Sequence, residues 1–122
     1  MKETRPPAAR DQLPLSPIVL HVLLSLVDGD KHGYAIIKEV RTRTSGEVEL
    51  GASSLYSVLK RLLAEGLVSE TTERPDPALD DERRRYYRLT RFGRGVAIAE
   101  LRRLESLISQ ARAKRLVWSG KG

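Results

Sequence analysis

Apolar and polar positions along the chain predict three short helices, two strands and one long final helix. Ser16 and Pro17 suit a helix start, the serine as N-cap and the proline at the first helical position. Residues 18–27 are then apolar nearly all round, which is typical of a buried central helix. The polar turn at residues 28–30 ends this helix, and Asp30 is a candidate cap for the next one.

A second helix is expected to open near residues 32–33 and to carry its apolar side chains up to Val40. The polar residues 42–46 break it. Residues 47–50 alternate between polar and apolar and predict a short extended segment.

The third helix, expected from about residue 52 to residue 65, has two different faces. At about 100° per residue, one apolar stripe faces the core and consists of Leu55, Val58, Leu59 and Leu62. The opposite side carries small and polar residues, namely Ser53, Ser57, Lys60 and Ala64, flanked by Tyr56 and Arg61. Its exposed face therefore offers hydrogen-bond donors and allows close approach to a partner.

Two strands are predicted next, over residues 67–72 and 84–90, joined by a polar loop at 73–82 that contains two prolines. This pattern is typical of a β-hairpin. In the second strand Tyr87 and Leu89 alternate with Arg84, Tyr86 and Arg88, so the cations share one face with a tyrosine.

The last helix is expected from about residue 91 to residue 116 and carries an apolar seam at heptad-like spacing. The seam consists of Ala97, Leu101, Leu104, Ile108 and Ala111, and Ile98 and Leu107 widen it. A long helix after a small domain needs a partner surface to bury such a seam. We therefore predict a homodimer interface formed by Leu101, Leu104, Ile108 and Ala111.

At 122 residues the chain fits one domain with short appendages. We expect a flexible N-terminal arm over residues 1–15, the main domain over 16–90, and a dimerisation helix with a tail over 91–122. The apolar run at 17–27 covers about half of a membrane crossing and begins too far from the N-terminus for a signal peptide. A cytoplasmic protein without membrane contact is therefore expected.

The charge of the chain is informative mainly through its distribution, since the net value is only +6 at pH 7. The segment from residue 83 to residue 94 holds six arginines and no carboxylate, namely Arg83, Arg84, Arg85, Arg88, Arg91 and Arg94. These arginines are expected to lack neighbouring carboxylates and, with Lys60 and Arg61, to form a basic stripe that contacts phosphates. The other interpretation is a solvated basic strand and helix start.

The order of three helices followed by two strands predicts a winged helix-turn-helix fold, mainly α with a small β-hairpin. In this arrangement the third helix enters the major groove of double-stranded DNA, which is wide enough for a helix. The hairpin, or wing, reaches an adjacent stretch of the DNA backbone. Because one such domain reads only one half-site, a homodimer is expected.

Three groups of residues resemble the PadR family of transcriptional regulators. They are His32-Gly33-Tyr34-Ala35-Ile36, the set Leu55-Tyr56, Leu59-Lys60-Arg61-Leu62 and Glu65-Gly66-Leu67-Val68, and Arg85-Tyr86-Tyr87-Arg88-Leu89-Thr90. The resemblance covers residues 16 to about 95 and implies a dimeric winged helix-turn-helix protein. It also implies a repressor that binds an inverted-repeat operator and, as in many members, releases it when a small-molecule effector binds. The final helix is similar to the single dimerisation helix of the family's short branch.

Two departures from the family pattern affect the predicted interface. Ser57 stands where the family usually has proline, which adds a hydrogen-bond donor to the DNA face. The loop at 73–82 is acidic where the family is often glycine-rich. Since carboxylates repel phosphates, we expect the wing to contact DNA through its second strand rather than through its tip.

The predicted DNA-binding residues come from the second helix, the third helix and the wing. They are Tyr34, Ser53, Ser54, Tyr56, Ser57, Lys60, Arg61, Arg84, Arg85 and Arg88. Tyr34 and Tyr56 have a second interpretation as packing residues. Tyr87 is expected at the base of the wing, His21 as a packed histidine, and Trp118 against the partner subunit.

No catalytic, metal or cofactor site is predicted, because the chain has two histidines and no cysteine and residues 51–55 lack the second glycine of a nucleophile elbow. Two other functions stay open. A winged-helix protein-interaction module without DNA binding should lose the basic face, and an RNA-binding protein should show aromatic stacking platforms.

Overall fold

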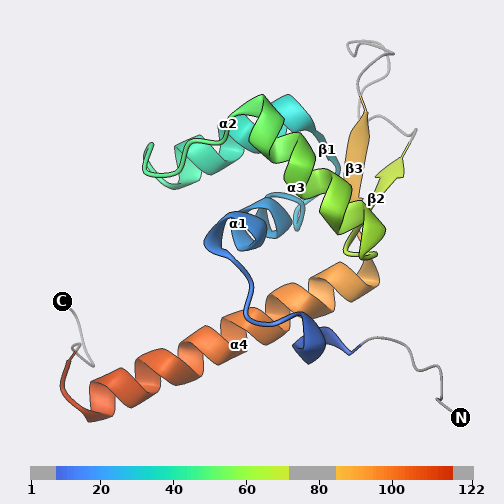
Figure 1. The fold of residues 1–122 in the computed structure, drawn as a ribbon. Helices are drawn as coiled ribbons and strands as arrows, with labels where there is room; N and C mark the ends of the chain where they lie inside the picture. The colour runs from blue at the N-terminus through green and yellow to red at the C-terminus, as the bar shows by residue number, and fades with distance from the viewer. Residues whose placement is uncertain (1–7, 72–84, 117–122) are drawn as a thin grey trace, which may run out of the picture.

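The computed structural model describes residues 8–71 and 85–116 (Figure 1). Its elements in chain order are η1 (Ala9–Gln12), α1 (Pro17–Ser25), β1 (Lys31–His32), α2 (Gly33–Arg43), α3 (Ala52–Ala64), β2 (Val68–Thr71), β3 (Tyr86–Leu89) and α4 (Arg91–Ala113). Helices α1 to α3 gather on one side of the sheet, and α4 runs past them and extends beyond the domain (Figure 1). This is the predicted winged helix-turn-helix fold with a long final helix.

One aliphatic core holds α1, α2, α3 and the start of α4 together. Fully buried side chains from each of these helices meet there, among them Leu23, Ile36, Leu55 and Val96. The apolar stripe predicted for α3 is confirmed, since Leu55, Leu59 and Leu62 are buried and Val58 is partly buried. Among the helices within residues 8–71 and 85–116, none has the length and apolar character that a bilayer crossing requires.

Side-chain caps define where the helices begin. Ser16 caps α1 as predicted, its Oγ accepting from the Val19 amide at 3.2 Å. The cap of α2 is His32, whose Nδ1 accepts from the Ala35 amide at 3.2 Å, and not Asp30 as the sequence suggested.

The sheet has three antiparallel strands in the order β1-β3-β2. Strands β2 and β3 pair as the predicted hairpin, with Val68 opposite Leu89. The strand β1 was not predicted; it places Lys31 opposite Tyr87 and His32 opposite Tyr86. Residues 47–50, predicted as extended chain, form no strand, and the loop at 73–82 lies outside the described residues.

Residues 8–15 pack along α4, so the predicted free arm is not observed over this part of the chain (Figure 1). Leu13 and Leu15 pack against the core, and the Leu15 amide donates to Glu100 Oε2 at 3.2 Å. The buried Glu100 carboxylate also accepts from Arg103 Nε at 2.6 Å and from its terminal nitrogen at 2.9 Å. The arginine, with the Leu15 amide, holds the pKa of Glu100 below its ordinary value despite the burial.

Candidate nucleic-acid interface

The polar face predicted for α3 is exposed along its length. The exposed residues are the four of the predicted face, its two flanking residues and one further predicted contact, namely Ser53, Ser57, Lys60 and Ala64, Tyr56 and Arg61, and Ser54. Because the opposite face is fixed in the core by Leu55, Leu59 and Leu62, the helix cannot rotate without exposing apolar surface. The polar face therefore has one fixed orientation toward solvent, as a recognition helix requires.

An aromatic group lies where α2 begins. The His32 ring stacks on Tyr34 at a centroid distance of 6.4 Å and meets the edge of Tyr86 at 5.3 Å. Tyr34 is 63 % exposed, so its interpretation as a core residue is wrong. Tyr56 of α3, which is 50 % exposed, reaches over Gly33 and brings the start of α2 and the face of α3 together.

The register of the sheet separates the wing arginines. Because Lys31 is opposite Tyr87 and His32 is opposite Tyr86, Arg85 lies level with the start of α2. Arg88 lies three residues further along β3, about 10 Å away at the usual rise of a strand. Arg85 therefore belongs with the exposed tyrosines, and Arg88 lies at the other end of β1. Arg84 lies outside the described residues.

Both described arginines of the wing strand have acidic partners, so the expectation that this strand lacks neighbouring carboxylates is wrong. A terminal nitrogen of Arg85 lies 3.5 Å from Glu70 Oε2 on the adjacent strand β2. Arg88 forms a closer pair with Asp30, at 2.8 Å between its terminal nitrogen and Asp30 Oδ2. The sequence missed these pairs because both partners are distant along the chain.

A buried tyrosine, Tyr87, supports the base of the wing. Tyr87 is buried in β3, as predicted. Burial, with the nearby Glu70 carboxylate and Tyr56, raises the pKa of its hydroxyl, so this group stays protonated at neutral pH. This tyrosine is therefore part of the support beneath the interface.

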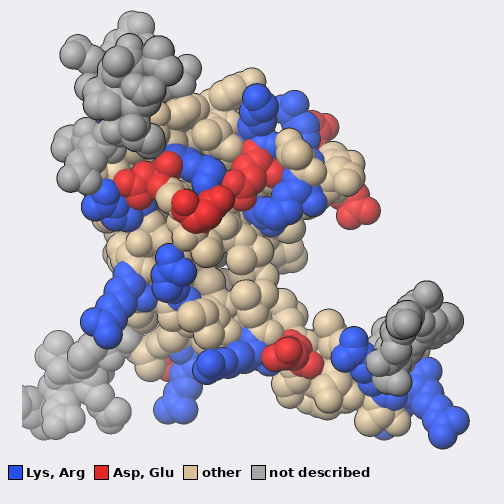
Figure 2. Space-filling view, turned by 180° about the vertical axis from the view of Figure 1, so that it is seen from behind, with Lys and Arg blue, Asp and Glu red and all other residues tan. Residues whose placement is uncertain are grey.

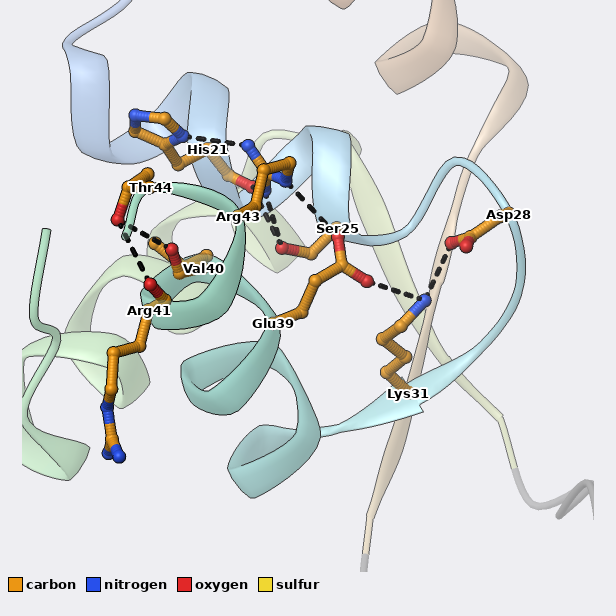
Figure 3. A network of polar contacts seen from close by, with 9 residues as sticks. All are labelled: His21, Ser25, Asp28, Lys31, Glu39, Val40, Arg41, Arg43 and Thr44. Atoms are coloured by element: carbon orange, nitrogen blue, oxygen red, sulfur yellow. Dashed lines mark hydrogen bonds and ion pairs between the residues drawn. The ribbon is translucent and has the colours of Figure 1, made fainter. Parts of the chain in front are cut away.

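Seen from behind, acidic and basic side chains are interleaved over the upper half of the molecule (Figure 2). Ion pairs join some of the described charges, as in the network in which Glu39 oxygens lie 3.4 Å from both Lys31 Nζ and Arg43 Nε (Figure 3). This face therefore lacks the continuous basic surface that phosphate binding favours.

The predicted seam of α4 is largely exposed in the protomer. Leu101 is 43 % exposed and Ile108 is 48 % exposed, whereas Leu104 and Ala111 are partly buried. A groove along this helix is lined by Ile98, Leu101, Arg102, Leu104, Glu105, Ile108 and Arg112. Ala97, predicted as part of the seam, is buried in the core of the single chain. Trp118 lies outside the described residues.

Within residues 8–71 and 85–116, no three histidine or acidic side chains come together as metal ligands would. The neighbour of His21 is a cation: a terminal guanidinium nitrogen of Arg43 lies 3.0 Å from His21 Nδ1. Burial and this guanidinium lower the pKa of His21.

Comparison with known proteins agrees with this geometry. The fold is similar to a transcriptional regulator from Clostridium thermocellum, with a TM-score of 0.65 and 25% identity, over 83% of this chain and 97% of the other. A PadR family regulator from Clostridium difficile gives a TM-score of 0.62 and 25% identity, over 84% of this chain and 100% of the other. Bacillus subtilis PadR in complex with operator DNA gives a TM-score of 0.58 and 23% identity, over 70% of this chain and 47% of the other.

The sequence model of the transcriptional regulator PadR-like family matches residues 19–99, which include most of α1, all of α2 and α3, the sheet and the start of α4. The match thus covers the core and the exposed face of α3 together. The chain belongs to the PadR-like family of transcriptional regulators.

Proposed function

We propose that this regulator binds double-stranded DNA sequence-specifically, with α3 in the major groove and the wing strand beside it. The observation that carries the proposal is the exposed polar face of α3, held by a buried apolar stripe. Bacillus subtilis PadR, which shares the fold, binds operator DNA. The dimensions of a major groove suit a helix with this face.

The residues of this face divide by chemistry into base and phosphate contacts. Ser53, Ser57 and Lys60 point away from the core stripe and supply donors for base edges. Tyr34 and Tyr56 lie at its edge, where a hydroxyl suits a phosphate oxygen. Ser54, two positions before Tyr56, lies at the other edge of the face, on the same side as Arg61, and stays a predicted contact.

Two cations at the edge of this surface, Arg61 and Arg85, form only weak ion pairs with carboxylates of the same chain. Arg61 lies 3.3 Å from Glu65 and Arg85 lies 3.5 Å from Glu70, and all four side chains are at least partly exposed. Exposed pairs contribute only about 0–1 kcal/mol, so a DNA phosphate can displace either carboxylate. Arg84 stays a predicted phosphate contact.

The functional unit in this proposal is a homodimer joined through α4. Full burial of a Leu or Ile side chain stabilises a protein by about 1.5–3 kcal/mol, and roughly half of the surface of each exposed Leu or Ile in the groove is still accessible to solvent in the single chain. In a parallel pairing Glu105 and Arg112 would each meet their own copies. An antiparallel pairing avoids this repulsion, and its two-fold symmetry suits an inverted-repeat operator as that of a parallel pair would.

The proposal also covers the effect of the protein on transcription and the place in the cell where it acts. A dimer on an inverted repeat acts most simply as a repressor, and it works in the cytoplasm, where a bacterial type of regulator meets DNA. The small-molecule effector implied by the family resemblance stays a prediction.

A DNA titration at several salt concentrations tests the function. Fluorescence anisotropy of labelled duplexes should show affinity that falls with salt, with a log–log slope of about −0.9 per phosphate contact. A selected duplex should also bind more tightly than an unrelated one. Salt-insensitive or absent binding would favour the protein-interaction module instead.

A further inference from the structure

Among the described residues of the wing, Asp30 and Arg88 form the best-defined ion pair. Arg88 Nε donates to both Asp30 oxygens at 3.2 Å, and a terminal nitrogen donates to Oδ2 at 2.8 Å. The carboxylate is 21 % exposed and the guanidinium 46 % exposed. A two-pronged arginine–carboxylate pair of this kind is stronger and more directional than a single exposed contact.

The Asp30–Arg88 pair lies one position beyond the last backbone pairing of β1 with β3. Since Lys31 is opposite Tyr87, the next position places Asp30 opposite Arg88 across the two strands. Strand β1 has only two residues, so backbone pairing alone holds it weakly on β3. A directly opposite pair of unlike charges adds to the stability of such a short ladder.

Strand β1 also leads directly into the helix-turn-helix. His32 is the last residue of β1 and the cap of α2. Lys31 points the other way, to Asp28 at 2.7 Å and to Glu39 of α2 at 3.4 Å (Figure 3). One side of β1 is thus tied to α2, and the Asp30–Arg88 pair ties it to the wing strand.

We propose that Asp30 and Arg88 are positioning residues, whose ion pair fixes β1 on β3 and so sets the wing strand relative to α3. The inference rests on the proposed function, since the positioned surface is the DNA interface. Arg88 then acts without touching DNA: it lies at the end of β1 away from Gly33, and its guanidinium is held by a carboxylate. Arg85, at the near end, contacts phosphate.

The variant Asp30→Asn separates positioning from phosphate contact, because the two roles predict opposite signs. If the pair positions the wing, operator affinity falls by about fivefold to tenfold while the salt slope stays unchanged. If Arg88 instead contacts phosphate, removing Asp30 removes a carboxylate that competes with the phosphate, so affinity rises and the slope steepens by about 0.9. Tighter binding, or no change in affinity, would overturn the inference.

A matched control and a rescue complete the DNA titrations. Asp28→Asn removes the same charge from the same turn, and Lys31 keeps Glu39, so affinity should stay within about twofold. The charge swap Asp30→Arg with Arg88→Asp should regain part of the affinity lost in Asp30→Asn. A swap that binds more weakly than Asp30→Asn would contradict the positioning role.

Hydrogen–deuterium exchange without DNA tests the same pair independently of the function. In Asp30→Asn the amides of β1 and of residues 86–88 should exchange faster, while those in the centre of α3 keep their rates. Unchanged exchange at β1 would overturn the inference whatever the titrations give. A wild-type protein that binds no DNA would instead contradict the proposed function, so the two failures are distinguishable.

Discussion

The Tyr56 hydroxyl lies directly over Gly33, only 2.6 Å from where a β carbon on that residue would be. The two residues belong to different helices of the helix-turn-helix, α3 and α2. Only glycine leaves room for the ring at this position. The contact explains in physical terms why a glycine precedes the exposed Tyr34.

Gly33→Ala should displace the Tyr56 ring with little loss of stability. The clashing atoms are the outer end of a side chain, which can swing away, so the free energy of unfolding should change by less than about 1 kcal/mol. DNA affinity should nevertheless fall, because Tyr56 leaves the interface. On a Tyr56→Ala background the same substitution should have almost no effect on affinity, and an equal loss there would contradict this explanation.

Gly93→Ala should be strongly destabilising, because the clash is with backbone. A β carbon on Gly93 would lie 2.0 Å from the Leu67 carbonyl oxygen, at the crossing of α4 and the start of β2. We expect a loss of about 1–3 kcal/mol or more in chemical denaturation. Gly95→Ala is the control: nothing lies within 4 Å of the added carbon, so stability should rise by about 0.5–1 kcal/mol.

The pH dependence of stability should report the Glu100 pair. The pKa of Glu100 is lowered in the folded state. The ionised carboxylate therefore stabilises the fold above the ordinary carboxyl pKa of about 4.3, and this stabilisation is lost as the pH falls through the pKa of the folded state. Glu100→Gln should therefore flatten the acid side of the stability curve. Denaturation of both proteins across that pH range measures the difference, and parallel curves would count against the pair.

These contacts show which features the sequence could predict. The two faces of α3 follow from local periodicity, so Leu55, Lys60 and their neighbours were placed correctly. Strand β1 is too short to show an alternation. The packing of residues 8–15 depends on Glu100, whose partner Leu15 lies 85 positions away, and Arg88 meets Asp30 across 58 positions. The composition of the chain and the local spacing of its residues do not indicate which distant residues form pairs.

Ile108→Asp should convert the proposed dimer into monomers. Ile108 is 48 % exposed in the protomer, so the folded monomer tolerates the charge, whereas a buried interface does not. Leu104→Asp should act in the same way, although Leu104 is partly buried already. Sedimentation velocity gives the oligomeric state. Leu116→Asp, at an 80 % exposed residue beyond the groove, should stay dimeric.

Lys60→Ala should reduce discrimination between DNA sequences. Lys60 lies on the face of α3 opposite the core stripe, from which it would contact base edges in the proposed complex, and one good base contact is worth about 1–3 kcal/mol of discrimination. Affinity for the operator should fall more than affinity for random duplex, measured at the same salt. Lys38→Ala removes the same charge from α2 and serves as the control. Equal losses on both duplexes in Lys60→Ala would reassign the residue to phosphate.

Selection of binding sites from random duplex DNA tests the central claim most directly. The wild-type protein, at a salt concentration of about 0.15 M, should enrich an inverted repeat whose half-sites lie about 34–36 Å apart, or a multiple of this. Ile108→Asp should lose this enrichment while keeping weak binding to single half-sites. Recovery of DNA without any enriched sequence, or of no DNA at all, would contradict sequence-specific recognition by α3.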